Sequence, residues 1–244
     1  MRSGTLVPGA SSPSPAAGDG ASAPGLVWGV VVAAGLGRRF GAEKQFLSLT
    51  GKPVHLWAVE ATRTVAAGVV LVVPPGREHD PHLALAADRV VAGGKTRSAS
   101  VRAGLGAVPE DAAIIVVHDA VRPLASEALF RAVVSAVVAG AEGAIPGLDV
   151  PDTVKFVEAG VVRSTIERAN LVRVQTPQAF RAATLRRAHA SETDATDDAA
   201  VVEALGARVV VVPGEEGNLK ITSPADLALL EWRLAVGSLA QQAP

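Results

Sequence analysis

Short runs rich in valine and isoleucine alternate with longer amphipathic segments from Leu26 onward. Such runs are typical of parallel strands buried on both faces, and the segments between them are typical of helices that cover a sheet. The runs predict strands at residues 27–32, 69–73, 90–92, 114–118 and 209–212. Helices are predicted at residues 54–65, 98–105, 127–138, 179–189 and 224–239, the last with Ser223 as its N-cap. We therefore expect an α/β fold with a doubly wound, mostly parallel sheet, which binds ligands at the carboxyl ends of its strands.

Residues 152–175 interrupt this alternation. Two short stretches of alternating polar and apolar residues flank Ala159 and Gly160, which predicts a β-hairpin. A hairpin alone is marginally stable in water, so it packs either on its own domain or on a second subunit. Packing on a second subunit is the alternative favoured here. We expect residues 150–175 to form a protruding arm through which the chain makes a homodimer.

The first 25 residues differ in composition from the rest of the chain. They are rich in Ser, Pro, Ala and Gly and cannot bury enough apolar surface to offset the entropy of ordering. We expect a disordered tail at residues 1–25 and one domain at residues 26–244. The tail lacks the apolar centre of a secretory signal, and no other stretch has the roughly 20 apolar residues of a membrane helix.

Charge and cysteine content narrow the chemistry. The 23 Lys and Arg balance 24 Asp and Glu, so no overall field attracts nucleic acid or an anionic membrane, and any phosphate site must be local. The absence of cysteine excludes disulfides, thiolate metal ligands and a cysteine nucleophile, and it fits a reducing compartment. We expect a cytoplasmic protein without nucleic-acid or membrane partners, whose chemistry depends on Arg, Lys, Asp, Thr and backbone amides.

The strongest local signal is the sequence AAGLGRRF at residues 33–40, directly after the first predicted strand. Small residues let backbone amides approach a ligand closely, and successive N–H groups in a tight loop bind anions. Arg38 and Arg39 follow the glycines, and Lys44 comes soon after. This order favours a polyphosphate site, while a glycine turn with solvated charges stays open as the alternative.

Two other nucleotide-binding motifs do not fit this loop. A dinucleotide-binding turn needs G-x-G-x-x-G, but Gly41 lies one position too far from Gly35 and Gly37. A P-loop needs glycine before its lysine and Ser or Thr after it, but Lys44 stands between Glu and Gln.

Two further clusters follow predicted strands. In GGKTRSASVRAGL, residues 93–105, Ser98 or a neighbour is placed to cap the next helix, whose N-terminal amides favour an anion or a polar base edge. In HDAVRP, residues 118–123, Asp119 is placed to hold a metal or a hydroxyl, and Arg122 to meet a phosphate. An ordinary capped helix and a structural Asp–Arg pair are the respective alternatives.

Taken in order along the chain, these segments resemble the 2-C-methyl-D-erythritol 4-phosphate cytidylyltransferases of the non-mevalonate isoprenoid pathway. Each matching block is weak alone, but their joint order and spacing are specific, and they extend over nearly everything after the tail. The blocks are AAGLGRR, KQFL, GGKTRSASV, VHDAVRP, DTVK, ER, TPQAF, TDDA and NLKITSPADL.

The resemblance implies a Rossmann-like nucleotidyltransferase that joins CTP to 2-C-methyl-D-erythritol 4-phosphate and releases pyrophosphate. It implies catalytic roles for Arg39 and Lys44, which would neutralise the triphosphate. It implies nucleotide binding by Ala33, Ala34, Gly35, Leu36, Gly37, Gly94, Ser100, Asp119 and Ala120. It implies acceptor binding by Asp119, Arg122, Thr153, Arg168, Thr176 and Lys220, several of them reaching from the hairpin of a second subunit. A Mg²⁺ would bridge the CTP phosphates close to Asp119, and no residue is assigned as its ligand.

The connection FGAE before Lys44 is shorter than the family's usual stretch and lacks its proline.

Three alternative functions stay open. The first is a cytidylyltransferase that acts on ribitol 5-phosphate or a related polyol phosphate. The second is a non-catalytic nucleotide-binding protein, and the third, which the glycine spacing disfavours, is a nicotinamide-dependent oxidoreductase.

Overall fold

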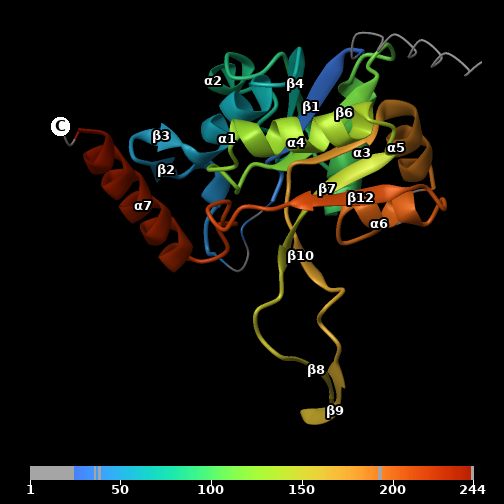
Figure 1. Ribbon diagram of the computed structural model, residues 1–244. Coiled ribbons are helices and arrows are strands. Elements are labelled where there is room, and N and C mark those ends of the chain that lie inside the picture. Colours follow the sequence, from blue (N-terminus) through green and yellow to red (C-terminus); the bar gives the residue numbers. More distant parts are fainter. Residues whose placement is uncertain (1–24, 36, 38–39, 192–193, 243–244) are drawn as a thin grey trace, which may run out of the picture.

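An eight-stranded sheet forms the centre of the molecule (Figure 1). The computed structural model describes residues 25–35, 37, 40–191 and 194–242, so residues 1–24 of the predicted tail lie outside the described residues. The strands are β1 (Val27–Val32), β4 (Gly68–Val73), β5 (Arg89–Ala92), β6 (Ile114–Asp119), β7 (Gly143–Asp149), β10 (Val172–Val174), β11 (Gln178–Arg181) and β12 (Val209–Pro213).

The strand order is β10-β7-β11-β6-β1-β4-β5, and β12 pairs with β7. Strand β1 is parallel to both β4 and β6, β5 is parallel to β4, and β12 is parallel to β7. Strands β10 and β11 run antiparallel to their neighbours. The predicted mostly parallel α/β sheet is therefore confirmed. The chain runs outward from β1 through β4 to β5 and then returns to place β6 on the other side of β1. This reversal creates a topological switch point between β1 and β6, where ligands of such sheets bind.

Seven α-helices surround the sheet in the described part of the chain. They are α1 (Val54–Arg63), α2 (Pro81–Ala84), α3 (Arg97–Ala107), α4 (Glu127–Val138), α5 (Ala182–His189), α6 (Asp198–Glu203) and α7 (Pro224–Gln242). Strand side chains point alternately to opposite faces, so Val30 packs in a cluster with α3, α5 and α6, whereas Val31 packs in a cluster with α1 and α2. Helix α4 packs on the same face as α1. Among the described residues, none of the helices combines the length and apolar character needed to cross a bilayer.

The predicted strands and helices are present, with shifted ends in most cases, and one boundary was wrong. Residues 179–181 were predicted as the start of a helix, but they belong to β11, and α5 begins at Ala182. Ala179 and Phe180 are fully buried and pair with both β6 and β7, so tertiary burial outweighs their continuity with a helical sequence. The cap of α3 is Thr96, which accepts from the Ala99 amide, rather than Ser98.

Helix α7 begins as predicted. The Ser223 hydroxyl accepts from the Asp226 amide, and the Asp226 carboxylate accepts from the Ser223 amide, which is a reciprocal capping box. The helix contacts a small antiparallel pair, β2 (Ser48–Leu49) and β3 (Lys52–Pro53). This pair follows the short 3-10 helix η1 (Lys44–Phe46), so the C-terminal helix braces the segment that carries Lys44.

Strands β8 (Val154–Glu158) and β9 (Val161–Ile166) form a two-stranded antiparallel hairpin that projects from the body (Figure 1). The turn residues Ala159 and Gly160 have φ angles of 49° and 79°. Two consecutive positive φ values are the conformation that twists a two-residue turn to match its strands. The hairpin forms a separate sheet and pairs with no strand of the body.

Candidate active site

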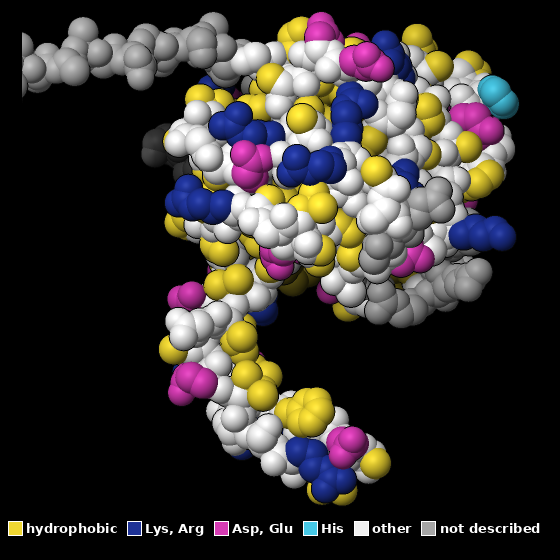
Figure 2. Space-filling model, turned by 90° about the vertical axis from the view of Figure 1, so that its right-hand side faces the viewer, with side chains coloured by type: hydrophobic (Ala, Val, Ile, Leu, Met, Phe, Trp, Pro, Cys, Tyr) yellow, Lys and Arg dark blue, Asp and Glu magenta, His cyan; other side chains and the backbone are white. Residues whose placement is uncertain are grey.

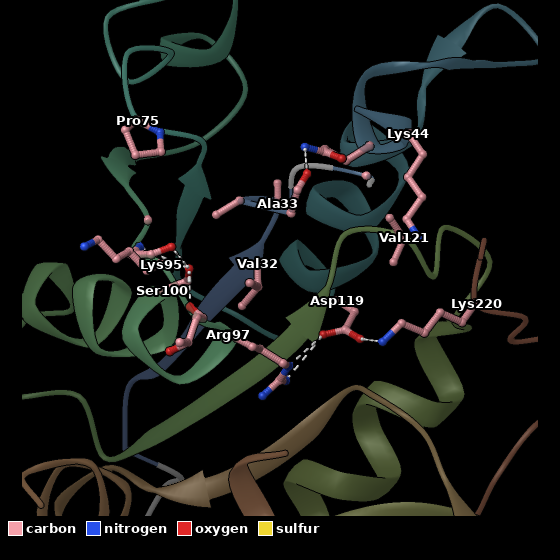
Figure 3. Close-up of a pocket in the computed structure, with 17 residues that line it drawn as sticks. Val32, Ala33, Lys44, Pro75, Lys95, Arg97, Ser100, Asp119, Val121 and Lys220 are labelled. Carbon is pink, nitrogen blue, oxygen red and sulfur yellow. Dashed lines mark hydrogen bonds and ion pairs between the residues drawn. The ribbon is translucent and has the colours of Figure 1, made fainter. Parts of the chain in front are cut away.

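A pocket of about 710 Å³ opens at the carboxyl ends of the strands, around the switch point between β1 and β6 (Figure 3). Its size is that of a pocket for a small organic ligand. Of its described lining residues, four are Lys or Arg and one is acidic, so the pocket is cationic overall. The lining residues are Val32, Ala33, Ala34, Gly35, Gly37, Lys44, Gln45, Pro75, Gly93, Gly94, Lys95, Thr96, Arg97, Ser100, Asp119, Val121 and Lys220.

The glycine loop after β1 is closed by its own backbone. Gly37 has a φ of 60°, and a Cβ atom there would lie 1.7 Å from the Ala42 carbonyl oxygen, so only glycine fits. The Phe40 and Gly41 amides both donate to the Gly37 carbonyl. The predicted residues Leu36 and Arg39 lie outside the described residues.

Two hydrogen bonds anchor η1, and with it Lys44, to the protein beneath. The Gln45 side-chain amide donates to the Gly35 carbonyl over 2.9 Å, and the His55 Nδ1 lies 3.0 Å from the Gln45 carbonyl. Gln45 is almost fully buried. Although the FGAE connection is short, these hydrogen bonds therefore hold Lys44 beside the glycine loop, where it lines the pocket.

A second turn, after β5, forms the opposite wall. A Cβ atom on Gly93 would lie 2.4 Å from that of Ala34, so a glycine permits the two loops to approach this closely. The Ser100 hydroxyl donates to the Thr96 carbonyl and lies 3.2 Å from the Gly94 amide nitrogen. Ser100 and the Gly93–Gly94 turn are thus held together at the N-terminus of α3, which favours polar or anionic ligand groups.

The electrostatic centre of the pocket is Asp119, at the end of β6. One carboxylate oxygen lies 2.7 Å from the Lys220 Nζ, and the other lies 3.3 Å from the Arg97 Nε (Figure 3). Arg97 also binds Asp198 through its Nη1 at 2.8 Å, and Asp198 lies 3.0 Å from the His189 Nε2. A continuous chain of hydrogen-bonded polar and charged side chains therefore runs from the pocket through the core to His189 on α5.

These contacts set the ionisation state of Asp119. Burial alone would raise the pKa of Asp119, but the positive charges of Arg97 and Lys220 hold that pKa well below its usual value. Burial likewise opposes the charge of Arg97, yet Asp119 and Asp198 raise the pKa of its guanidinium. Asp119 is thus a carboxylate at every physiological pH, so it cannot act as a proton donor there.

The other residues predicted near Asp119 lie beneath the pocket rather than in its lining. Ala120 is fully buried, and its amide donates to the Val32 carbonyl. The Thr176 hydroxyl accepts from the Asp119 amide at 3.0 Å and lies 3.1 Å from the His118 Nδ1. Arg122 donates to the Asn218 carbonyl. Of these groups, Thr176 supports Asp119 directly, by accepting from its backbone amide.

His118 gives a prediction about acid stability. Burial lowers the pKa of His118 to about 4, whereas an unfolded histidine titrates near 6.5. Between pH 6.5 and 4 this histidine binds a proton in the unfolded chain but not in the folded chain. The free energy of unfolding that it contributes is therefore fully present above about pH 6.5 and is lost as the pH falls to 4. The full loss amounts to about 3 kcal/mol. Chemical unfolding from pH 7 to 4 should show a shallower loss for His118→Gln, and an unchanged one for the exposed control His82→Gln. Equal slopes for wild type and His118→Gln would contradict the prediction.

Two predicted acceptor residues do not join the pocket of their own chain. Thr153 and Arg168 lie exposed beside the hairpin, where the Arg168 Nη1 donates to the Val150 and Pro151 carbonyls over 2.5 and 2.6 Å. Neither residue lines the pocket. In contrast, Arg97 lines it but had no predicted role, because the partner that fixes it from behind, Asp198, is 101 residues away in sequence.

Asp119 is the residue of the described lining that would hold a Mg²⁺. Among the described residues no group of three or more His, Cys, Asp or Glu is placed to hold a metal, and Asp119 is the one acid of the described lining. Magnesium is commonly bound by one or two carboxylates together with phosphate oxygens and water. Asp119 therefore fits as a single carboxylate beside a metal that arrives with a nucleotide.

The sheet, the glycine loop at its switch point and the cationic pocket define a Rossmann-like nucleotidyltransferase. The model of the family described as 2-C-methyl-D-erythritol 4-phosphate cytidylyltransferase matches residues 27–235. The chain belongs to this family.

Individual relatives agree with this assignment. A protein of that name from Streptomyces coelicolor is 45% identical over 227 residues, which cover 84% of this chain and 84% of the relative. The crystal structure of the Thermus thermophilus protein of the same name is similar with a TM-score of 0.72 and 37% identity, covering 84% of this chain and 98% of that one. A 4-diphosphocytidyl-2C-methyl-D-erythritol synthase from Anaerococcus prevotii gives a TM-score of 0.75 at 28% identity, covering 87% of this chain and all of that one.

Proposed function

We propose that this chain transfers the cytidylyl group of CTP to 2-C-methyl-D-erythritol 4-phosphate, giving 4-diphosphocytidyl-2-C-methyl-D-erythritol and pyrophosphate. The observation that carries the proposal is the convergence of the glycine loop, Lys44 and Lys220 on one pocket at the switch point. The family of the chain and the names of its relatives support the same reaction.

The chemistry requires charge neutralisation rather than a general base. The acceptor phosphate is already an anion, so its oxygen attacks the α-phosphorus of CTP directly, and the bond from that phosphorus to the β-phosphate oxygen breaks as pyrophosphate leaves with the electron pair. Lys44 and Arg39 would neutralise the charge that builds on the phosphates. Asp119 is the residue that would hold a Mg²⁺ in the pocket, and that metal would supply further positive charge for the phosphates. Asp119 forms ion pairs with Arg97 and Lys220. These ion pairs would keep both cations in the pocket.

The nucleotide base would lie against the second wall of the pocket. Gly94 and Ser100, whose amide and hydroxyl are hydrogen-bonded to each other, would contact the base there, and the loop from Ala33 to Gly37 would enclose the ribose and phosphates with its backbone. Thr176 would act on the acceptor through the position of Asp119, whose amide donates to it, and Arg122 would contribute its positive charge from outside the described lining.

A product assay tests the proposed reaction. Purified protein with CTP, Mg²⁺ and 2-C-methyl-D-erythritol 4-phosphate should release pyrophosphate and form the CDP-linked product, detected by mass spectrometry. Parallel reactions with ribitol 5-phosphate, and with UTP or ATP in place of CTP, should be much slower. Faster reaction with ribitol 5-phosphate would make the acceptor assignment wrong, and CTP binding without pyrophosphate release would make the protein a non-catalytic binder.

The hairpin is proposed to be a dimerisation arm. Phe156, Val161 and Val162 on it are each more than half exposed, and Figure 2 shows hydrophobic side chains along the projection. An arm with so much exposed apolar surface is stabilised by packing on another chain.

The cytoplasmic location stays a prediction from the sequence.

Dimerisation can be tested by sedimentation. Wild-type protein should sediment as a dimer at micromolar concentration, and Phe156→Asp should shift it to the monomer because a charge would be buried in the interface. Leu85→Asp, which alters a side chain that is 87% exposed on the body, is the matched control and should stay dimeric. A monomeric wild type would contradict the proposal.

A further inference from the structure

A second, smaller pocket of about 220 Å³ lies between α3 and α5. It is lined by Arg102, Leu105, Gly106, Arg186, His189 and Ala190, none of which lines the pocket at the strand ends. Its volume is several times the roughly 30 Å³ that one water occupies, which leaves room for a tetrahedral oxyanion. Figure 2 looks onto the side of the molecule where α5 lies, and several Lys and Arg side chains gather there.

Arg102 is the feature of this pocket that most needs an explanation. Within the described chain its guanidinium makes no hydrogen bond or ion pair, and its Nη1 is buried without a partner. A buried donor that lacks an acceptor costs about 1–3 kcal/mol, and more when it is charged. A water molecule would satisfy the hydrogen bond but not the charge, whereas an anion would satisfy both.

Two further groups are fixed beside it. Arg186 donates to the Leu105, Val108 and Pro109 carbonyls, over 3.2, 3.0 and 2.9 Å, so its guanidinium is held at the C-terminal end of α3. No carboxylate in the described part of the chain pairs with Arg186. The described lining of this pocket therefore contains two guanidinium groups and no acidic side chain.

His189 closes the inner end. It is only 4% exposed, and its Nε2 lies 3.0 Å from the Asp198 carboxylate. A carboxylate only accepts, so Nε2 carries a hydrogen, and the Nδ1 is left buried without a partner. Arg102 and His189 both line this pocket, and each has a buried polar atom without a partner. In this tautomer the His189 Nδ1 is an acceptor, so it would suit the O–H of a hydrogen phosphate rather than a bare anionic oxygen.

We propose that the pocket between α3 and α5 is a binding site for a small oxyanion, either inorganic phosphate or the phosphate group of a metabolite. Arg102 supplies the unpaired charged donor, and Arg186 adds a second fixed positive charge. Charge-assisted hydrogen bonds from guanidinium groups are the interactions that bind phosphate most strongly in proteins. The site is separate from the proposed catalytic pocket, and its occupancy does not depend on the reaction proposed above.

Binding can be located by NMR with inorganic phosphate as the probe. In ¹⁵N-labelled protein, titration at constant ionic strength should shift the amide signals of Gly106 and Ala190 along a saturable curve. Arg102→Met should weaken this binding by about tenfold or more, the equivalent of one lost charge-assisted hydrogen bond. Arg187→Met, which removes an exposed arginine of α5 that does not line the pocket, should leave this binding unchanged. A second titration with glycerol 3-phosphate distinguishes the sources: a site for free phosphate binds it less well, and a site for phosphate monoesters binds it at least equally.

Several outcomes would overturn the proposal. These are shifts that grow without saturation, shifts confined to the amides of Gly35 and Gly94, or equal affinities in wild type and Arg102→Met. Folding is not expected to interfere, because Arg102 makes no polar contact that the methionine would lose. Should that variant nevertheless unfold, Arg102→Lys retains the charge with fewer donors and should bind several-fold more weakly, and unchanged affinity in that variant would equally end the proposal.

Discussion

Replacing Lys44 with alanine is expected to lower turnover with CTP by about 10²–10³-fold, with much smaller changes in the Michaelis constants. Removal of one preorganised electrostatic group from a transition state typically has an effect of this size. Lys44 is a strong candidate for such a group because Gln45 and the Gly35 carbonyl fix its turn before any ligand arrives. The backbone that carries the Lys44 side chain is therefore in place before charge builds on the phosphates.

The measurement is steady-state pyrophosphate release at saturating and limiting CTP. Lys52→Ala is the matched control, because Lys52 lies eight residues further along, pairs with Glu60 and stacks on Trp57 away from the pocket lining. It should keep near-native turnover. If Lys44→Ala kept near-native turnover and Michaelis constants, Lys44 would have no role in the reaction. If only the Michaelis constant for CTP rose, Lys44 would stabilise the bound nucleotide equally in the ground state and the transition state.

The sequence predicted the centre of the sheet well because that part follows simple rules. Strands β1, β4 and β6 are continuous apolar runs buried on both faces, and the loop that follows β1 is marked by its glycines. These features are local in sequence. The same holds for the capping box at Ser223 and for the Ala159–Gly160 turn of the hairpin.

The antiparallel edge of the sheet was not predictable in the same way. Strand β7 contains Gly143, Pro146 and Gly147, which weaken any strand pattern, yet β12 and β11 flank it and supply its pairing. Strand β11 has only four residues and continues directly into α5. Long-range pairing outweighs local preference at both positions.

The residues of the site also divide into those that local sequence features predict and those that depend on long-range contacts. Local motifs pointed to Lys44 and Asp119, and the family resemblance added Ser100; all three line one pocket. The function of Arg97 as a clamp between Asp119 and Asp198 depends on two contacts that span 22 and 101 residues. No spacing rule reveals such a contact. The unpaired guanidinium of Arg102 is equally invisible in the sequence, because an arginine on a helix is usually solvated.

Arg168 gives the sharpest test of how two chains would form one site. It lies beside the hairpin, exposed, and outside the lining of its own pocket. If the arm reaches the pocket of a second subunit, Arg168→Ala should raise the Michaelis constant for the acceptor phosphate strongly while that for CTP changes little. Loss of one cation from a phosphate contact corresponds to about 10- to 100-fold. If Arg168 acted only within its own chain, as a structural contact to Val150 and Pro151, both constants should stay near the wild-type values.

Mixed dimers separate a shared site from two independent ones. Lys44→Ala and Arg168→Ala chains, each nearly inactive at low acceptor concentration, are combined and allowed to exchange subunits. In a symmetric dimer with swapped arms, half of the dimers are mixed, and each mixed dimer has one site that carries both mutations and one site that carries neither. Activity should therefore return to about one quarter of the wild-type value. If each site were built from a single chain, every site would carry one mutation whatever the pairing, and mixing would restore nothing. The recovery of activity is thus a direct measure of whether Lys44 of one chain works with Arg168 of another.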